Sequence, residues 1–343
     1  MSPHIEQFFH RIPKVELHLH LEGAIPHDAL WTLCQKYGGD AEISSLEALE
    51  QRFEYVDFPH FILTWVWKNQ FLREYEDFTF IAERVAKDLA SQNIRYAEVF
   101  FSPPDHFRFG LETQKLTEAI HLGLSRVPEI TVSLIADVVR DFGPQRAAQT
   151  LREIHEVQTL GIIGIGLGGS EQDYPPELFE EVFEEARRFG LHTTAHAGEA
   201  AGAQSIWGAI HHLHPERIGH GMRAYEDEAL LDYLVEQQLP LELCPISNVR
   251  TGVVKRIEDH PVADYFTRGI LVTINTDDPK MFGNSLELEY QTLAQVFGFT
   301  KSDIHKLLNN AIRASWLPEE SKQQLAEQFN DEISLISKQL SAE

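Results

Sequence analysis

The feature that most constrains the fold is a regular alternation of short apolar runs with longer segments of helical periodicity. Strands that alternate with helices pair in parallel, with the helices on the outside of the sheet. Eight such units predict an α/β fold, a (β/α)8 TIM barrel, and we expect residues 1–343 to form one domain. The predicted strands are 14–20, 94–101, 131–138, 161–167, 191–196, 216–219, 239–243 and 270–275.

The segments between the strands carry helical patterns of different kinds. Segment 177–189 has one apolar stripe and is followed by Gly190, which is typical of a helix end. Residues 40–90 predict a long helical insertion after the first strand, rich in aromatic side chains. Two interpretations of it stay open: packing between helices, or a lid that forms an apolar wall for a substrate. From about residue 300 we expect C-terminal helices that cover the barrel.

Composition excludes several classes of function. The 343 residues carry a formal net charge of −24, which disfavours nucleic acid and anionic membranes as partners. Cys34 and Cys244 are the only cysteines, so neither a disulfide framework nor a four-cysteine zinc site can form. No apolar run approaches the ~20 residues of a transmembrane helix, and the first residues lack a leader pattern. We therefore expect a cytoplasmic protein.

Polar side chains gather where the predicted strands end, which is where TIM barrels carry their chemistry. His18 and His20 lie two apart on the first strand, so both point to the same face. Packing alone explains such repeated clusters poorly, because buried His and Asp need partners. The clusters are 18–20, 168–171, 196–199, 219–221, 244–248 and 275–279.

These clusters contain the ligands of a catalytic divalent metal. Three imidazoles and one carboxylate suit Zn²⁺, which in catalytic sites keeps a position for water. Fe²⁺ and Mn²⁺ remain open, because ligand type only biases the choice of metal. The predicted ligands are His18, His20, His196 and Asp277.

Other polar residues of the clusters suit different roles. Glu199 lies three residues past His196, on the turn that leaves the fifth strand, so we expect it to move protons at the substrate. His220 and Asp278 are predicted to support the metal or face the substrate. We interpret Cys244 as a small buried residue rather than a nucleophile.

Five blocks together resemble the adenosine deaminase family of metal-dependent hydrolases. They are 13–24, 196–199, 217–221, 243–248 and 275–279, and they occur in the family's order over nearly the whole chain. The resemblance implies an enzyme that converts a 6-aminopurine to the 6-oxo product and ammonia. It also implies one zinc ion on the four ligands predicted above.

The resemblance implies roles for five residues around the purine. Glu199 would protonate N1, which makes C6 electrophilic. His220 and Asp277 would orient the attacking water. Asp278 would bind N7, and the backbone N–H of Gly169 would meet N3.

Departures from the family pattern leave the substrate open. His20 and Glu22 are further predicted substrate contacts, but adenosine deaminases usually carry Asp where this chain has Glu22. Gly219 and segment 282–285 differ from the pattern usual in adenine deaminases. Segment 166–171 is similar to enzymes that deaminate 6-aminodeoxyfutalosine. We therefore expect adenosine as the substrate, with 6-aminodeoxyfutalosine and then adenine as alternatives.

The sequence disfavours two functions other than deamination. A metal enzyme acting on a phosphoester or lactone is disfavoured, because two-metal relatives carry a Lys at the end of strand four and this chain has none. A non-catalytic zinc or nucleoside binder would not need Glu199. A deaminase of this kind would act on small purine nucleosides in purine salvage, with self-association left open.

Overall fold

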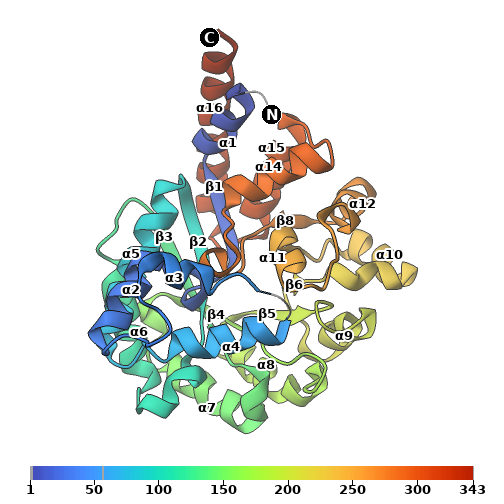
Figure 1. The fold of residues 1–343 in the computed structure, drawn as a ribbon. Coiled ribbons are helices and arrows are strands. Elements are labelled where there is room, and N and C mark those ends of the chain that lie inside the picture. The colour runs from blue at the N-terminus through green and yellow to red at the C-terminus, as the bar shows by residue number, and fades with distance from the viewer. Residues whose placement is uncertain (1–2, 56–57, 343) are drawn as a thin grey trace.

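The computed structural model describes residues 3–55 and 58–342, and its centre is a barrel of eight parallel strands (Figure 1). The strands follow one another around the barrel in sequence order. The predicted (β/α)8 fold is confirmed, and each strand ends within two residues of its predicted limits. The strands are β1 (Lys14–His20), β2 (Ile94–Phe101), β3 (Thr131–Asp137), β4 (Ile162–Gly166), β5 (His192–Ala197), β6 (Arg217–His220), β7 (Leu241–Leu243) and β8 (Val272–Ile274).

Two backbone hydrogen bonds join the first strand to the segment that follows the last one. The Asp277 N–H donates to the His18 carbonyl and the His20 N–H donates to the Asp277 carbonyl, each at 2.9 Å. Below them, the Leu17 N–H donates to Oδ1 of Asn275 at 3.0 Å. The barrel is therefore nearly closed at the end where β1 finishes.

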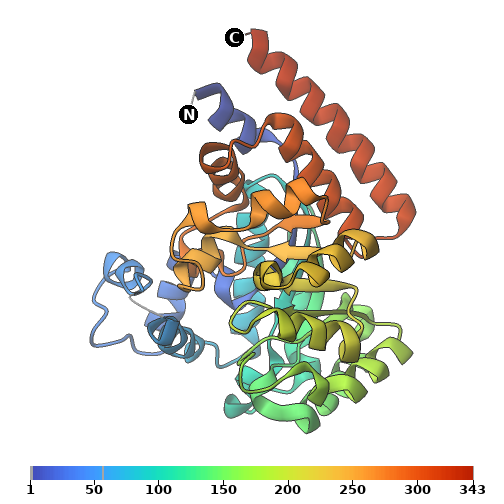
Figure 2. The same cartoon turned by 90° about the vertical axis from the view of Figure 1, so that its right-hand side faces the viewer.

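Helices surround the barrel and bury their apolar faces against it. The structure divides the predicted insertion 40–90: α5 packs against β2 and α6 as part of the ring, whereas α3 and α4 stand outside it (Figure 2). The helices up to β4 are α1 (Pro3–Arg11), α2 (His27–Lys36), α3 (Leu46–Gln51), α4 (Phe58–Asn69), α5 (Tyr75–Ser91), α6 (Thr113–Leu124) and α7 (Gly143–His155).

The second half of the chain continues the same pattern. The helix predicted over 177–189 starts later, because Pro175 and Pro176 lead into a 3-10 turn before α8. The C-terminal helices are present, and α16 runs beside α1 away from the barrel (Figure 1). The helices are α8 (Glu180–Arg188), α9 (Ala203–Gly208), α10 (Glu228–Gln237), α11 (Pro245–Arg250), α12 (Val262–Arg268), α13 (Pro279–Phe282), α14 (Leu286–Val296), α15 (Lys301–Ala314) and α16 (Glu319–Ala342).

No helix in residues 3–55 and 58–342 is long and apolar enough to cross a membrane.

A buried ion network joins three strands inside the barrel. Arg217 on β6 lies 2.6 Å from Glu98 on β2 and 2.5 Å from Glu242 on β7. All three side chains are at most 1% exposed, so each charge depends on its partners for compensation.

Replacing Arg217 with Met should leave the buried carboxylates of Glu98 and Glu242 without their positively charged partner. We expect the free energy of unfolding to fall by about 3–5 kcal/mol, measured by chemical denaturation. The matched control is Arg95→Met, which removes the exposed pair with Glu332 on the same barrel and should change stability little. Equal effects in the two variants would contradict the structural importance of the buried network.

Candidate active site

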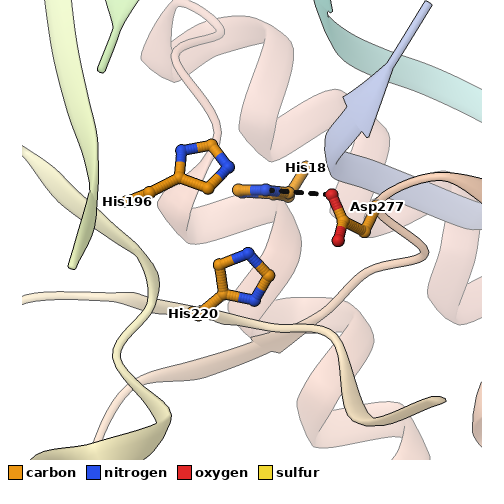
Figure 3. A group of neighbouring side chains, drawn as sticks. All are labelled: His18, His196, His220 and Asp277. Carbon is orange, nitrogen blue, oxygen red and sulfur yellow. Dashed lines mark ion pairs between the residues drawn. The ribbon is translucent and has the colours of Figure 1, made fainter. Parts of the chain in front are cut away.

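Five of the predicted residues meet at one end of the barrel. One donor atom from each of His18, His196, His220 and Asp277 lies within 4.8 Å of the others, and all four residues are buried (Figure 3). His20 joins them: its Nε2 lies 3.3 Å from Nε2 of His196 and 3.4 Å from Oδ1 of Asp277. The ends of β1, β5 and β6 and the segment after β8 thus converge.

The donor atoms of this cluster fit a divalent metal. Nε2 of His18 is buried without a hydrogen-bond partner among the described residues, 3.6 Å from Oδ1 of Asp277. The Nε2 atoms of His20 and His196 face each other. Three imidazole nitrogens and a carboxylate oxygen turned toward a common space make a suitable donor set for zinc.

A carboxylate behind His18 fixes which ring nitrogen faces the cluster. Nδ1 of His18 lies 2.7 Å from Oε2 of Glu242, so it donates its proton there and leaves Nε2 as a free donor atom. Although burial raises the pKa of Glu242, Arg217 and His18 lower it below its usual range. The buried network therefore keeps Glu242 ionised and holds His18 in position.

His220 has a different environment from the other histidines. Its Nδ1 accepts a hydrogen bond from the side-chain amide of Asn248 at 3.2 Å, while its Nε2 lies 3.5 Å from Oε2 of Glu199. A neutral imidazole that accepts at Nδ1 carries its proton on Nε2. That geometry suits a hydrogen-bond donor at the reaction centre rather than a metal ligand.

Glu199 lies on a loop that a second carboxylate holds in place. Glu171 accepts the backbone N–H groups of residues 198–201. Burial raises the pKa of Glu199 to about 8, and the charges of Asp277 and Glu171 contribute. Glu199 therefore combines an anchored backbone with a carboxyl group that holds a proton at neutral pH.

Two glycines leave room for polar groups of the site. A Cβ added to Gly23 would lie 1.7 Å from Oδ1 of Asp278, a buried atom without a partner among the described residues. Gly169 has a φ of +96°, and its N–H has no hydrogen-bond partner in the described parts of the chain. Both Asp278 and Gly169 line a cavity beside the cluster.

Glu22 lies behind the wall of this cavity. Its Oε1 accepts the Ser102 N–H at 3.1 Å and lies 3.3 Å from Nε2 of His106. Its side chain is 1% exposed and does not contribute to the cavity lining. Of the predicted site residues, His18 and Glu22 are the two that do not line the cavity, and of these two only His18 belongs to the donor cluster.

The cavity has a volume of about 440 Å³ and extends from the cluster to the ends of β2, β3 and β4. Helix α4 supplies an apolar wall of this cavity that includes Trp65. Asp105 and Asp137 also line the cavity, although they are not among the residues predicted from the sequence. The position of Asp137 at the end of a predicted strand was a usable signal.

Three residues of the cavity have strained backbones. Val139, His220 and Asp277 have φ values of +45°, +58° and +64°, in a region that non-glycine residues seldom adopt. Each such residue costs about 1–3 kcal/mol, and such strain concentrates at functional sites.

Comparison with known proteins agrees with this geometry. Residues 13–332 match the adenosine deaminase family. The chain belongs to the adenosine deaminase family. It is 35% identical over 319 residues to an adenine deaminase of Crocosphaera subtropica, covering 92% of this chain and 97% of that one. It is 32% identical over 332 residues to an aminodeoxyfutalosine deaminase of Streptomyces coelicolor, covering 95% and 86%.

A solved structure is similar over the full length. It is an amidohydrolase from Burkholderia ambifaria with bound Zn, with a TM-score of 0.91, 27% identity, and coverage of 100% of this chain and 96% of that one. The chain is thus a hydrolytic deaminase of a metal-dependent family that acts on small aminopurine-type substrates.

Glu242→Gln in the deaminase should weaken metal binding. The amide cannot accept the His18 proton as strongly, so we expect a loss of about 10–100-fold in metal affinity, measured by competition with a chelator.

The control is Glu289→Gln, another buried carboxyl group, which pairs with Asn284 and the Ile246 N–H and has no hydrogen bond to a histidine among the described residues. It should keep normal metal affinity. Equal losses in both variants would show that Glu242 has no specific role.

Proposed function

We propose that this deaminase hydrolyses the 6-amino group of purine nucleosides, converting adenosine to inosine and ammonia with one Zn²⁺. The observation that carries the proposal is the convergence of four metal donors on a cavity that also contains Glu199. The proposed ligands are His18, His20, His196 and Asp277.

Zinc is favoured by the donor set and by the zinc in the similar Burkholderia structure. When bound, such a metal lowers the pKa of water to ~7 and so supplies a nucleophile at neutral pH.

The residues around the cavity account for the proton transfers. Glu199 donates a proton to N1, which makes C6 electrophilic. The Nε2–H of His220 and the carboxylate of Asp277 orient the attacking water. The water oxygen adds to C6 and the bond from C6 to the amino nitrogen breaks. One water proton goes to that nitrogen, which leaves as ammonia, and the other restores the proton of Glu199, so that the oxygen remains as the 6-oxo group.

Two further groups orient the purine in this proposal. Asp278, whose Oδ1 has no partner among the described residues, hydrogen-bonds N7. The N–H of Gly169 hydrogen-bonds N3. Three nitrogens of the ring then fix its position with C6 toward the metal donors.

The size of the cavity admits a nucleoside, and Gly219 and segment 282–285 depart from the pattern usual in adenine deaminases. A volume of about 440 Å³ falls in the range of about 300–1,000 Å³ that holds drug-sized ligands. Because the Streptomyces relative is an aminodeoxyfutalosine deaminase, 6-aminodeoxyfutalosine is the second candidate substrate. Because the Crocosphaera relative is an adenine deaminase, adenine is the third.

We further propose that the whole chain acts as one domain, in the cytoplasm and in purine salvage. Cys34 and Cys244 are both buried and unpaired, which supports a reducing environment.

Glu199→Gln should retain the metal but lose proton donation to N1. We expect kcat to fall by at least about 10²-fold, as is typical of general acid–base groups. The matched control is Glu181→Gln on the exposed face of α8, which should keep full activity. Near-normal turnover by Glu199→Gln would show that Glu199 is not the proton donor to N1.

The substrate is tested by ammonia release from adenosine, 2′-deoxyadenosine, 6-aminodeoxyfutalosine and adenine. We expect the highest kcat/KM with adenosine. A clear preference for adenine or 6-aminodeoxyfutalosine would replace adenosine by that substrate, and no ammonia from any of the four would contradict the proposed reaction.

A further inference from the structure

The proposed function fixes the direction in which the sugar points, and the inference below rests on it. N1 meets the loop after β5, N3 meets Gly169 after β4, and N7 meets Asp278 after β8. N9 lies between N3 and N7, on the side of the purine away from N1. Because the strands follow sequence order around the barrel, the loops after β2 and β3 lie between those two contacts. The N9 substituent therefore points toward these loops.

A buried carboxylate from β3 faces this part of the cavity. Asp137 is 4% exposed, and its Oδ1 accepts the N–H groups of Gly168 at 2.7 Å and Val139 at 3.3 Å. Its Oδ2 has no hydrogen-bond partner in the described parts of the chain, although Asp137 lines the cavity. One oxygen is thus anchored to the backbone and the other is available to a ligand.

Asp105, which follows β2, likewise has one carboxylate oxygen held by hydrogen bonds and one without a partner among the described residues. Its Oδ2 accepts from Nε1 of Trp65 at 3.1 Å and from the amide of Asn69 at 3.4 Å. Its Oδ1 has no hydrogen-bond partner among the residues that the structure describes. Burial raises the pKa of Asp137 to about 6, and the charge of Asp105 contributes, so the two carboxylates influence each other.

The cations near these carboxylates lie outside the cavity lining and have other hydrogen-bond partners, although Lys68 interacts electrostatically with Asp105 and Arg140 with Asp137. Among the described residues that line the cavity there is no lysine or arginine. Lys68 donates to the Asn69 side chain and lies 3.6 Å from the centre of the Trp65 ring. Arg140 donates to the carbonyls of Tyr174 and His196. An anionic group at this position would therefore meet two carboxylates without a compensating cation from the lining.

We propose that Asp105 and Asp137 form the subsite for the N9 substituent, accepting hydrogen bonds from sugar hydroxyl or amine groups and rejecting carboxylate and phosphate. A hydroxyl or ammonium group that donates to a carboxylate makes a strong, charge-assisted hydrogen bond. A like charge in the same place is repelled by these carboxylates and disfavours binding. The subsite thus favours adenosine over nucleosides with an anionic 5′ group.

The test compares three nucleosides that differ mainly in charge at the 5′ position. They are adenosine, 5′-amino-5′-deoxyadenosine and adenosine-5′-carboxylic acid, and kcat/KM is measured for the metal-loaded enzyme. We expect the carboxylic acid to be at least about 100-fold poorer than adenosine, and the amine to be as good as adenosine or better.

Two variants, Asp137→Asn and Asp105→Asn, test whether this charge preference depends on the two carboxylates. Asn keeps the anchored acceptor oxygen and removes the charge, so each variant should lower kcat/KM for the amine and raise it for the carboxylic acid, narrowing the gap by about tenfold. General damage to the fold would instead lower kcat/KM for both the amine and the carboxylic acid. The control, Asp232→Asn on the exposed face of α10, should keep the wild-type order.

The outcomes separate this inference from the proposed function. Similar kcat/KM values for the three nucleosides in the wild type, or parallel losses for all three in the Asn variants, would overturn the subsite and leave the deaminase reaction intact. Turnover of adenine alone would overturn the subsite together with the choice of a nucleoside. Absence of ammonia from adenine and from every nucleoside would overturn the proposed reaction itself.

Discussion

The site depends on the contact that closes the barrel between its first strand and the segment after its last one. Asp277 exchanges backbone hydrogen bonds with His18 and His20, and the same three residues supply side chains to the cluster of proposed metal donors. The closure therefore joins the two ends of the barrel sequence and sets the distance between donors. Asp277 has a φ of +64°, so the fold bears backbone strain at this point.

Buried charge supports the cluster from inside the barrel. The chain of contacts from Glu98 through Arg217 and Glu242 ends at Nδ1 of His18. Burying these groups is expensive, and an apolar replacement of the whole network would serve stability as well. What the network provides is a fixed orientation of one imidazole, with its free nitrogen toward the other donors.

Much of the architecture could be predicted from the sequence, because β/α alternation dictates a parallel barrel and parallel strands bring their ends together. The same logic predicted that His18, His20, His196 and Asp277 would meet. The pattern cannot show which oxygen of a carboxylate is anchored, since Asp137 depends on an N–H group 31 residues away. Nor can it show that Glu22 turns toward His106 instead of the cavity.

We propose that a single metal ion binds where these four residues meet. The most direct test is a crystal structure of the purified, zinc-loaded protein with anomalous diffraction measured at the zinc edge. We expect one strong anomalous peak within bonding distance of Nε2 of His18, His20 and His196 and of the Asp277 carboxylate. A peak elsewhere, or no peak at this position in protein that deaminates its substrate, would contradict the proposal.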